Sequence, residues 1–199
     1  MKRVLVLCAA LALVGCVAQP DTPKPVTSAS ALPEVKAADF SAAAAANDRE
    51  AQVARGKMLL DQGSYFDPLP EAVALLEKAA QDGSVEAQMA LGYRYRAAYC
   101  SGPAIRLDRC NQARRWFQAA AETGDLEAMG VLVAMLSHPP LLDRSQAYYW
   151  ALLRQRQKAM PSANWVEECT ALKSALSNDI AVDQEKRVSQ WQPKPVAAD

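Results

Sequence analysis

The chain has 199 residues, of which 51% are hydrophobic and 22% are charged, a composition that suits one folded domain with a tail. The 22 basic side chains balance the 22 acidic ones, so the formal net charge is zero. This balance argues against nucleic-acid binding through a basic surface.

Residues 1–15 have the pattern of a targeting segment. Lys2 and Arg3 form a charged start. The apolar run that follows, from 4 to 14, is too short to span a membrane as a mature helix. We therefore interpret residues 1–15 as a signal peptide that is removed from the mature protein.

The signal peptide ends in Leu13-Val14-Gly15-Cys16, which resembles a bacterial lipobox. The resemblance implies cleavage before Cys16 and acylation of its thiol, palmitate included, which gives a lipid anchor. The alternative is an ordinary secretory signal peptide with a chance cysteine. Val17 is not the aspartate that commonly retains lipoproteins at the inner membrane. We therefore expect a lipoprotein on the periplasmic face of the bacterial outer membrane.

Residues 16–37 are predicted to be the lipidated cysteine and an extended tether. The stretch contains four prolines together with Ser, Thr and Asp, a composition typical of linkers. About twenty residues at ~3.1 Å each would reach at most ~60 Å from the membrane. The folded domain is expected over 38–191, followed by a disordered tail over 192–199.

The folded domain contains a repeated stretch. Residues 72–87 match residues 113–128 with a shift of 41, and six of the sixteen positions are identical. Alanine pairs in both copies allow a neighbouring helix to approach closely. Gly83 and Gly124 stand where a helix must stop, because glycine accepts the left-handed conformation without a steric penalty. The unit is therefore a helix, a glycine turn and a second helix.

The repeat predicts six helices near 48–62, 69–81, 84–99, 110–122, 125–136 and 143–158. A third copy ends in Trp150, which lies 34 residues after Trp116. We expect Trp116 to fill the space between neighbouring hairpins. A further helix is predicted from an apolar stripe at helical spacing, which consists of Trp165, Cys169, Leu172 and Leu176. The segment 182–191 follows it, and both should cover the last repeat.

Residues 87–95 read A-x-x-x-L-G-x-x-Y, with related copies at 51–59 and 128–136. Together with the glycine-turn unit, this motif resembles the Sel-one-like repeat family, a subclass of tetratricopeptide-like α/α solenoids. The resemblance covers roughly 48–191. It implies an all-α fold: a short superhelical solenoid of about three helix-turn-helix repeats with a C-terminal capping helix or helices. The flanking copies depart from the motif, with Arg55 for its leucine and Val133 for its glycine.

Cys100 and Cys110 flank the longest loop of the array. By the repeat alignment they lie at the open end of one hairpin, and an oxidising periplasm favours a disulfide between them. Two reduced buried thiols are the alternative. Cys169 is left over, and we expect it to be a buried core residue. An intermolecular disulfide is the alternative for this cysteine.

The sequence contains no recognisable catalytic motif. His138 is the only histidine, and no orienting partner is visible near it in sequence. No nucleophile elbow, phosphate loop or metal-spaced cluster occurs. We therefore expect no enzymatic activity, no cofactor and no metal site.

Four residues are predicted to bind a protein partner: Tyr93, Arg94, Arg114 and Arg115. Tyrosine and arginine dominate interface hot spots, and the family architecture places Tyr93 and Arg94 on the concave face. The alternative is that these side chains belong to the repeat core and to solvated helix faces. The expected function is a scaffold or adaptor for protein–protein interactions in assembly of an envelope complex, such as secretion, pilus or exopolysaccharide machinery. The alternatives are a peptidoglycan-binding or cell-wall-modifying enzyme and a structural spacer.

Overall fold

The computed structural model describes residues 48–63, 69–100, 105–157 and 162–196. Every described residue belongs to one unit of the chain, Val35–Asp199. The predicted signal peptide, Cys16 and the predicted tether lie outside the described residues. None of the helices within the described ranges is both long and apolar enough to cross a membrane.

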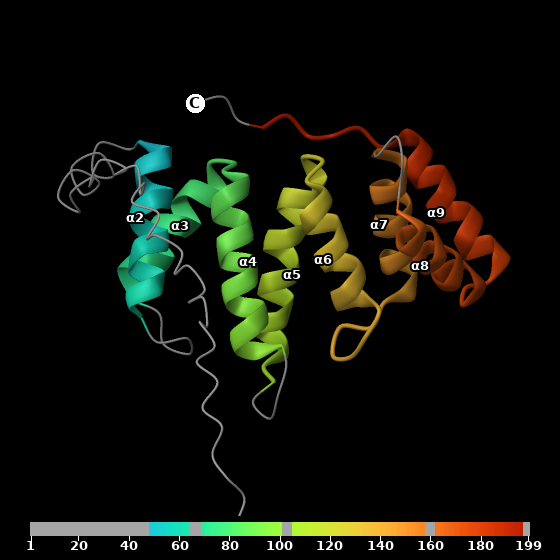
Figure 1. Ribbon diagram of the computed structural model, residues 1–199, viewed down its shortest axis with the longest axis horizontal. Coiled ribbons are helices and arrows are strands. Elements are labelled where there is room, and N and C mark those ends of the chain that lie inside the picture. The colour runs from blue at the N-terminus through green and yellow to red at the C-terminus, as the bar shows by residue number, and fades with distance from the viewer. Residues whose placement is uncertain (1–47, 64–68, 101–104, 158–161, 197–199) are drawn as a thin grey trace, which may run out of the picture. The chain divides into compact units, whose positions relative to one another are not determined.

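The described part of the chain consists of eight helices (Figure 1). Six of them match the predicted repeat helices within about three residues, and two follow after them. Their bounds are α2 (Arg49–Gln62), α3 (Pro70–Gln81), α4 (Val85–Tyr99), α5 (Leu107–Glu122), α6 (Leu126–Leu136), α7 (Arg144–Gln157), α8 (Ala163–Ser174) and α9 (Asn178–Gln190).

The helices pair in the order of the chain. Helices α2 and α3, α4 and α5, and α6 and α7 form three antiparallel hairpins. Helix α3 packs against α4, and α5 packs against α6, so each hairpin contacts the next. Helices α8 and α9 both pack against α7. The predicted all-α solenoid of three repeats with capping helices is therefore confirmed.

Two glycine turns join the hairpins to one another. Gly83 and Gly124 have φ angles of 92° and 102°, which only glycine adopts without strain. In the first turn the backbone N–H of Ser84 donates to the carbonyl of Ala79, and that of Gly83 donates to Ala80, as in a Schellman motif. The Ser84 hydroxyl then accepts from the backbone N–H of Ala87 and caps α4. The turn at Gly124 has the same bonds, because its sequence repeats the first.

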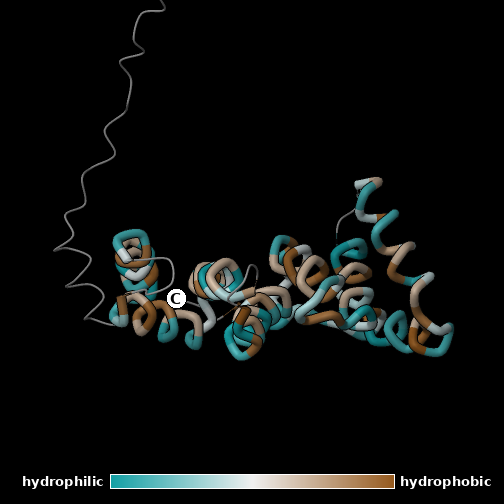
Figure 2. The backbone as a smooth tube through the Cα atoms, turned by 90° about the horizontal axis from the view of Figure 1, so that it is seen from below, coloured by the Kyte–Doolittle hydropathy of each residue, from teal (hydrophilic) through white to brown (hydrophobic). Residues whose placement is uncertain are grey.

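The core lies between the helices of each hairpin and between neighbouring hairpins. In Figure 2 apolar and polar residues alternate along each helix, as expected for helices that bury one side. Phe117 is fully buried and takes the place that we expected for Trp116, whose side chain is only half-buried. A Cβ on Gly92 would lie 2.8 Å from the Phe117 ring, so the glycine of α4 makes room for this ring.

The C-terminal helices cover the third repeat, as predicted. Helix α8 buries Cys169 and Leu172 and presents Trp165 to α7. Helix α9 buries Ala181 and Val188. Beyond α9 the chain is described as far as residue 196, and it has no regular secondary structure there. Residues 197–199 of the predicted disordered tail lie outside the described ranges.

Candidate interaction site

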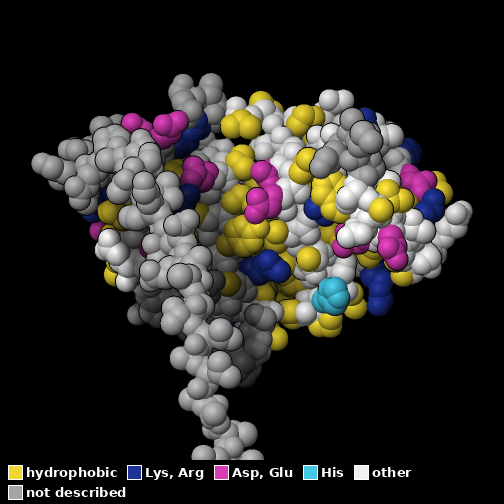
Figure 3. Space-filling view, in the orientation of Figure 1, with side chains coloured by type: hydrophobic (Ala, Val, Ile, Leu, Met, Phe, Trp, Pro, Cys, Tyr) yellow, Lys and Arg dark blue, Asp and Glu magenta, His cyan; other side chains and the backbone are white. Residues whose placement is uncertain are grey.

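A groove of about 350 Å³ lies between α4 and α6, the first helices of the second and third hairpins. We call it the α4–α6 groove. Figure 3, in the orientation of Figure 1, shows apolar side chains gathered where these helices lie. One stripe of α4 forms the first wall, and α6 with its following loop forms the second. The lining residues are Tyr93, Arg96, Ala97 and Cys100 on α4 and its end, and Ala134, Met135, His138, Pro139, Pro140 and Leu141 opposite.

Tyr93 is fixed at the wall of this groove by two contacts. Its hydroxyl donates to Oε1 of Glu127 at 2.6 Å. The edge of its ring meets Phe117, with ring centroids 5.1 Å apart and planes at 78°. Burial, followed by the hydrogen bond to Glu127, raises the pKa of Tyr93 to about 12. The side chain is still 37% exposed, so it can contact a partner while its hydroxyl stays protonated.

The structure does not bring the other predicted residues to this groove. Arg94 is half-buried and is not among the lining residues, because one residue along a helix turns the side chain by about 100°. Arg114 lines a separate hollow between α5 and α7, beside Trp150. Arg115 is exposed elsewhere on α5. The arginine that lines the groove together with Tyr93 is Arg96, which is not among the four predicted residues.

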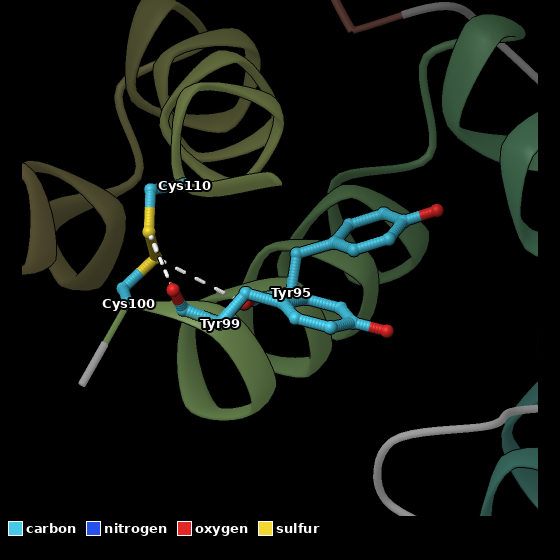
Figure 4. Close-up of a disulfide and its surroundings, with 4 residues drawn as sticks. All are labelled: Tyr95, Tyr99, Cys100 and Cys110. Atoms are coloured by element: carbon cyan, nitrogen blue, oxygen red, sulfur yellow. Dashed lines mark hydrogen bonds between the residues drawn. A yellow bond between two sulfur atoms is a disulfide. The ribbon is translucent and has the colours of Figure 1, made fainter. Parts of the chain in front are cut away.

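Cys100 and Cys110 form a disulfide at one end of the groove (Figure 4). Their Cα atoms are 5.2 Å apart, which is a normal separation for a disulfide. The backbone oxygen of Tyr99 lies 3.0 Å from Sγ of Cys110. The Arg109 guanidinium lies over the rings of Tyr95 and Tyr99, at 5.6 and 6.0 Å from their centroids. The disulfide therefore joins the end of α4, where Cys100 lines the groove, to the first turns of α5.

Cys169 and His138 carry side chains that could react, and the structure shows what surrounds each of them. Cys169 is a free, buried thiol, and burial raises its pKa to about 11. His138 is exposed, and its Nδ1 lies 3.2 Å from the backbone oxygen of Ala134, one turn earlier. No group of His, Cys, Asp and Glu side chains that could hold a metal ion occurs within the described ranges. Among the described residues a backbone oxygen contacts the His138 ring, whereas a carboxylate orients the histidine of a catalytic triad.

Sequence comparison finds no match: no family model fits the chain, and no curated protein matches it. Among solved structures, the chain is similar to a protective antigen present in uropathogenic Escherichia coli strains that displays an SLR fold. The TM-score is 0.55 and the identity 24%, over 77% of this chain and 32% of that chain. It is also similar to a Sel1 repeat protein from Oxalobacter formigenes, with a TM-score of 0.49 and 21% identity, over 78% of this chain and 64% of that one.

The chain therefore spans about a third of the length of the first of these proteins. The first similarity extends over most of the present chain and concerns the arrangement of helices. It agrees with the all-α arrangement of helices described above. The chain has the Sel1-like repeat fold, as its motif predicts.

Proposed function

We propose that this protein is a scaffold or adaptor that binds another protein through the α4–α6 groove. The observation that carries the proposal is the placement of Tyr93 and Arg96 beside Met135 in one hollow between neighbouring repeats. Aromatic and arginine side chains in partly desolvated positions carry most of the energy of protein interfaces. Stacked hairpins present such hollows as a continuous surface, which suits a helix or an extended segment of a partner.

The predicted signal peptide supports the further proposal that the protein works in the cell envelope. The basic, apolar segment that ends in Leu13-Val14-Gly15-Cys16 supports a lipid anchor at Cys16. The bond between Cys100 and Cys110 suits an oxidising compartment. The protein would then hold a partner on the periplasmic face of the outer membrane, in assembly of a secretion, pilus or exopolysaccharide complex.

Partner capture tests the groove. Wild type and the double variant Tyr93→Ala, Arg96→Ala are used to recover partners from cross-linked envelopes, with circular dichroism as the check on folding. The expected loss of affinity is about 2–4 kcal/mol if both residues are hot spots. Arg115→Ala is the matched control, because this arginine is exposed on α5 outside the groove. Full recovery by a folded double variant would contradict the proposal.

Fractionation tests the anchor. Cys16→Ala should leave an uncleaved precursor or release the protein from the membrane, because the acylated thiol is gone. Cys8→Ala is the matched control, since Cys8 lies inside the apolar part of the leader. A Cys16→Ala protein that is cleaved as wild type is and still fractionates with the membrane would contradict lipidation at this residue.

The alternative is a peptidoglycan-binding or cell-wall-modifying enzyme. Such an enzyme needs converging polar groups, one of which carries a proton to or from the substrate. In the α4–α6 groove the side chains that could take this role are Tyr93 and His138. The Tyr93 hydroxyl already donates to Glu127, so the geometry supports binding better than proton transfer.

A further inference from the structure

The chain after α9 returns over the repeats as an extended segment, drawn in red in Figure 1. We call residues 192–196 the C-terminal segment. Cβ of Pro193 lies 3.9 Å from the point where a Cβ on Gly124 would stand. Val196 lines a groove of about 570 Å³ between α2 and α4. The segment therefore passes from the turn between the second and third hairpins to the turn between the first and second.

Lys194 attaches the segment to the end of α5. Its backbone N–H donates to the carbonyl of Glu122 at 2.8 Å. Its ammonium group bonds to Oε2 of the same residue at 2.5 Å. The last carbonyls of a helix lack partners within the helix and carry partial negative charge, so both an N–H donor and a cation are favourable there. Lys194 thus supplies both groups at one helix terminus.

The length of the segment matches the usual spacing of neighbouring packed helices. Pro193 and Val196 are three residues apart, which is ~9 Å in a polyproline II conformation. Packed helices lie ~8–10 Å apart, so three extended residues cover about the distance from one helix to the next. Trp191, just before the segment, has φ −69° and ψ 140°, close to polyproline II. Pro193 and Pro195 fix their own φ and favour extended backbone in the residues before them.

The groove that receives Val196 is larger than its occupant needs. Its floor includes the apolar side chains of Val53 and Val85, and the paired charges of Lys57 and Glu86 stand at its edge. Val196 is 55% exposed, so it fills only part of this space. The Lys194 side chain is 68% exposed, and exposed ion pairs stabilise weakly. The segment is therefore held by a few contacts and can be displaced by a segment that makes more of them.

We infer that the edge of the solenoid formed by the two glycine turns is a binding site for an extended, proline-containing segment of a partner protein. The partner places a basic residue at Glu122 and an aliphatic residue, two positions later, in the groove between α2 and α4. The chain's own C-terminal segment occupies this site until the partner displaces it. The site is separate from the α4–α6 groove, so the inference does not depend on the proposed function.

A labelled peptide tests this site. The probe is a fluorescein-labelled peptide with the sequence of residues 190–199, and binding is followed by fluorescence anisotropy. A chain shortened to end at Trp191 should bind it. The full chain should bind it on the order of tenfold more weakly, because a tethered segment competes at millimolar effective concentration. Glu122→Ala in the shortened chain should weaken binding a few-fold, because it removes the ion pair and keeps the backbone bond. Glu167→Ala on α8 should not change binding.

A second variant keeps the test independent of the truncation. The full chain with Lys194→Ala and Val196→Asp should bind the peptide as the shortened chain does. Equal peptide binding by wild type, by the shortened chain and by the Lys194→Ala, Val196→Asp chain would overturn the inference. Absence of peptide binding by these two variants, when their circular dichroism shows normal helix content, would overturn it as well. A wild-type dimer that the truncation converts to a monomer would also overturn it, because the segment would then sit on a second copy.

Discussion

The bond from Tyr93 to Glu127 occupies the same place in the repeat as the ion pair of Lys57 with Glu86. The donor–acceptor distances are 2.6 and 2.5 Å. Each donor follows a helix glycine directly, and each glutamate precedes a repeated alanine. The bonds join α2 to α4 and α4 to α6, so a polar link recurs between the first helices of neighbouring hairpins.

A double-mutant cycle should show that the link at Tyr93 stabilises the solenoid. Tyr93→Phe removes the donor of this bond, and Glu127→Gln removes the charge of its acceptor. Urea unfolding measures the free energy of unfolding of each variant. We expect a coupling free energy of about 1 kcal/mol, below the roughly 1.5–3 kcal/mol of bonds to charged groups, because the site is partly exposed. The control cycle is Lys57 with Glu86, an exposed pair for which roughly 0.2–1 kcal/mol is expected. Strict additivity at Tyr93 and Glu127 would show that the bond contributes nothing.

The same bond should make stability depend on alkaline pH. The pKa of Tyr93 is raised from 10.0 to about 12, so the folded state favours the protonated phenol. This stabilisation is fully present below pH 10 and is lost as the pH rises from 10 towards 12. The difference in unfolding free energy between wild type and Tyr93→Phe should shrink across that window. A difference that is constant from pH 9 to pH 12 would contradict the raised pKa.

The helices could be predicted from the sequence because their signals are local. A glycine at the end, a serine or aspartate after it and alanine pairs before it set the boundaries of each hairpin. The bounds of α3, α4 and α6 lie within one residue of the prediction. Helix α5 starts three residues before the predicted position, at Leu107 instead of 110, inside the loop whose length no repeat copy defines.

The site was harder to predict because it depends on helix rotation and on loops. The sequence placed Tyr93 and Arg94 on the first-helix face. In the structure Tyr93 lines the α4–α6 groove together with Arg96, whereas Arg94 does not line it. The i, i+3 spacing from Tyr93 was the available signal, since it places Arg96 on the same stripe. The opposite wall includes the loop at Pro139 and Pro140, and the placement of a loop against another hairpin is a tertiary property without a local pattern.

Phe117 should contribute more to stability than its neighbour Trp116. Phe117→Ala removes a fully buried ring, for which a loss of about 3–5 kcal/mol is expected. Trp116→Ala should cost less, because that side chain is half-buried and the sequence-based expectation of a full core role does not hold. Denaturant unfolding of both variants makes the comparison. A larger loss for Trp116→Ala would mean that α5 is rotated relative to the structure.

Cys169 should react slowly in the folded protein. Its side chain is buried and its pKa is raised to about 11, so little thiolate is present at pH 8. Iodoacetamide should modify Cys169 only after unfolding, as followed by peptide mass mapping without reduction. Cys100 and Cys110 should appear as one linked pair of peptides. Rapid labelling of native Cys169, or its recovery in a disulfide, would contradict the structure.

Arg154 links the third repeat to the capping helices. Its guanidinium carbon lies 3.5 Å from the centroid of the Trp165 ring on α8. Gly130 of α6 is also close, since an added Cβ there would lie 2.9 Å from that same carbon. The guanidinium therefore packs against both Gly130 and the Trp165 ring, and burial lowers the pKa of Arg154 from its ordinary value.

This arrangement predicts how three variants should combine. The coupling between Arg154→Gln and Trp165→Leu should be about 0.5–2 kcal/mol, the range for a cation over an aromatic ring. Gly130→Ala displaces the flexible end of the arginine and should therefore lose this coupling energy, offset in part by the higher helix propensity of alanine. In its presence the other two changes should become additive. Gly92→Ala is the contrasting control, since its Cβ would meet the buried ring of Phe117 and should cost about 1–3 kcal/mol. Undiminished coupling in the Gly130→Ala background would mean that the arginine reaches Trp165 without the space that this glycine provides.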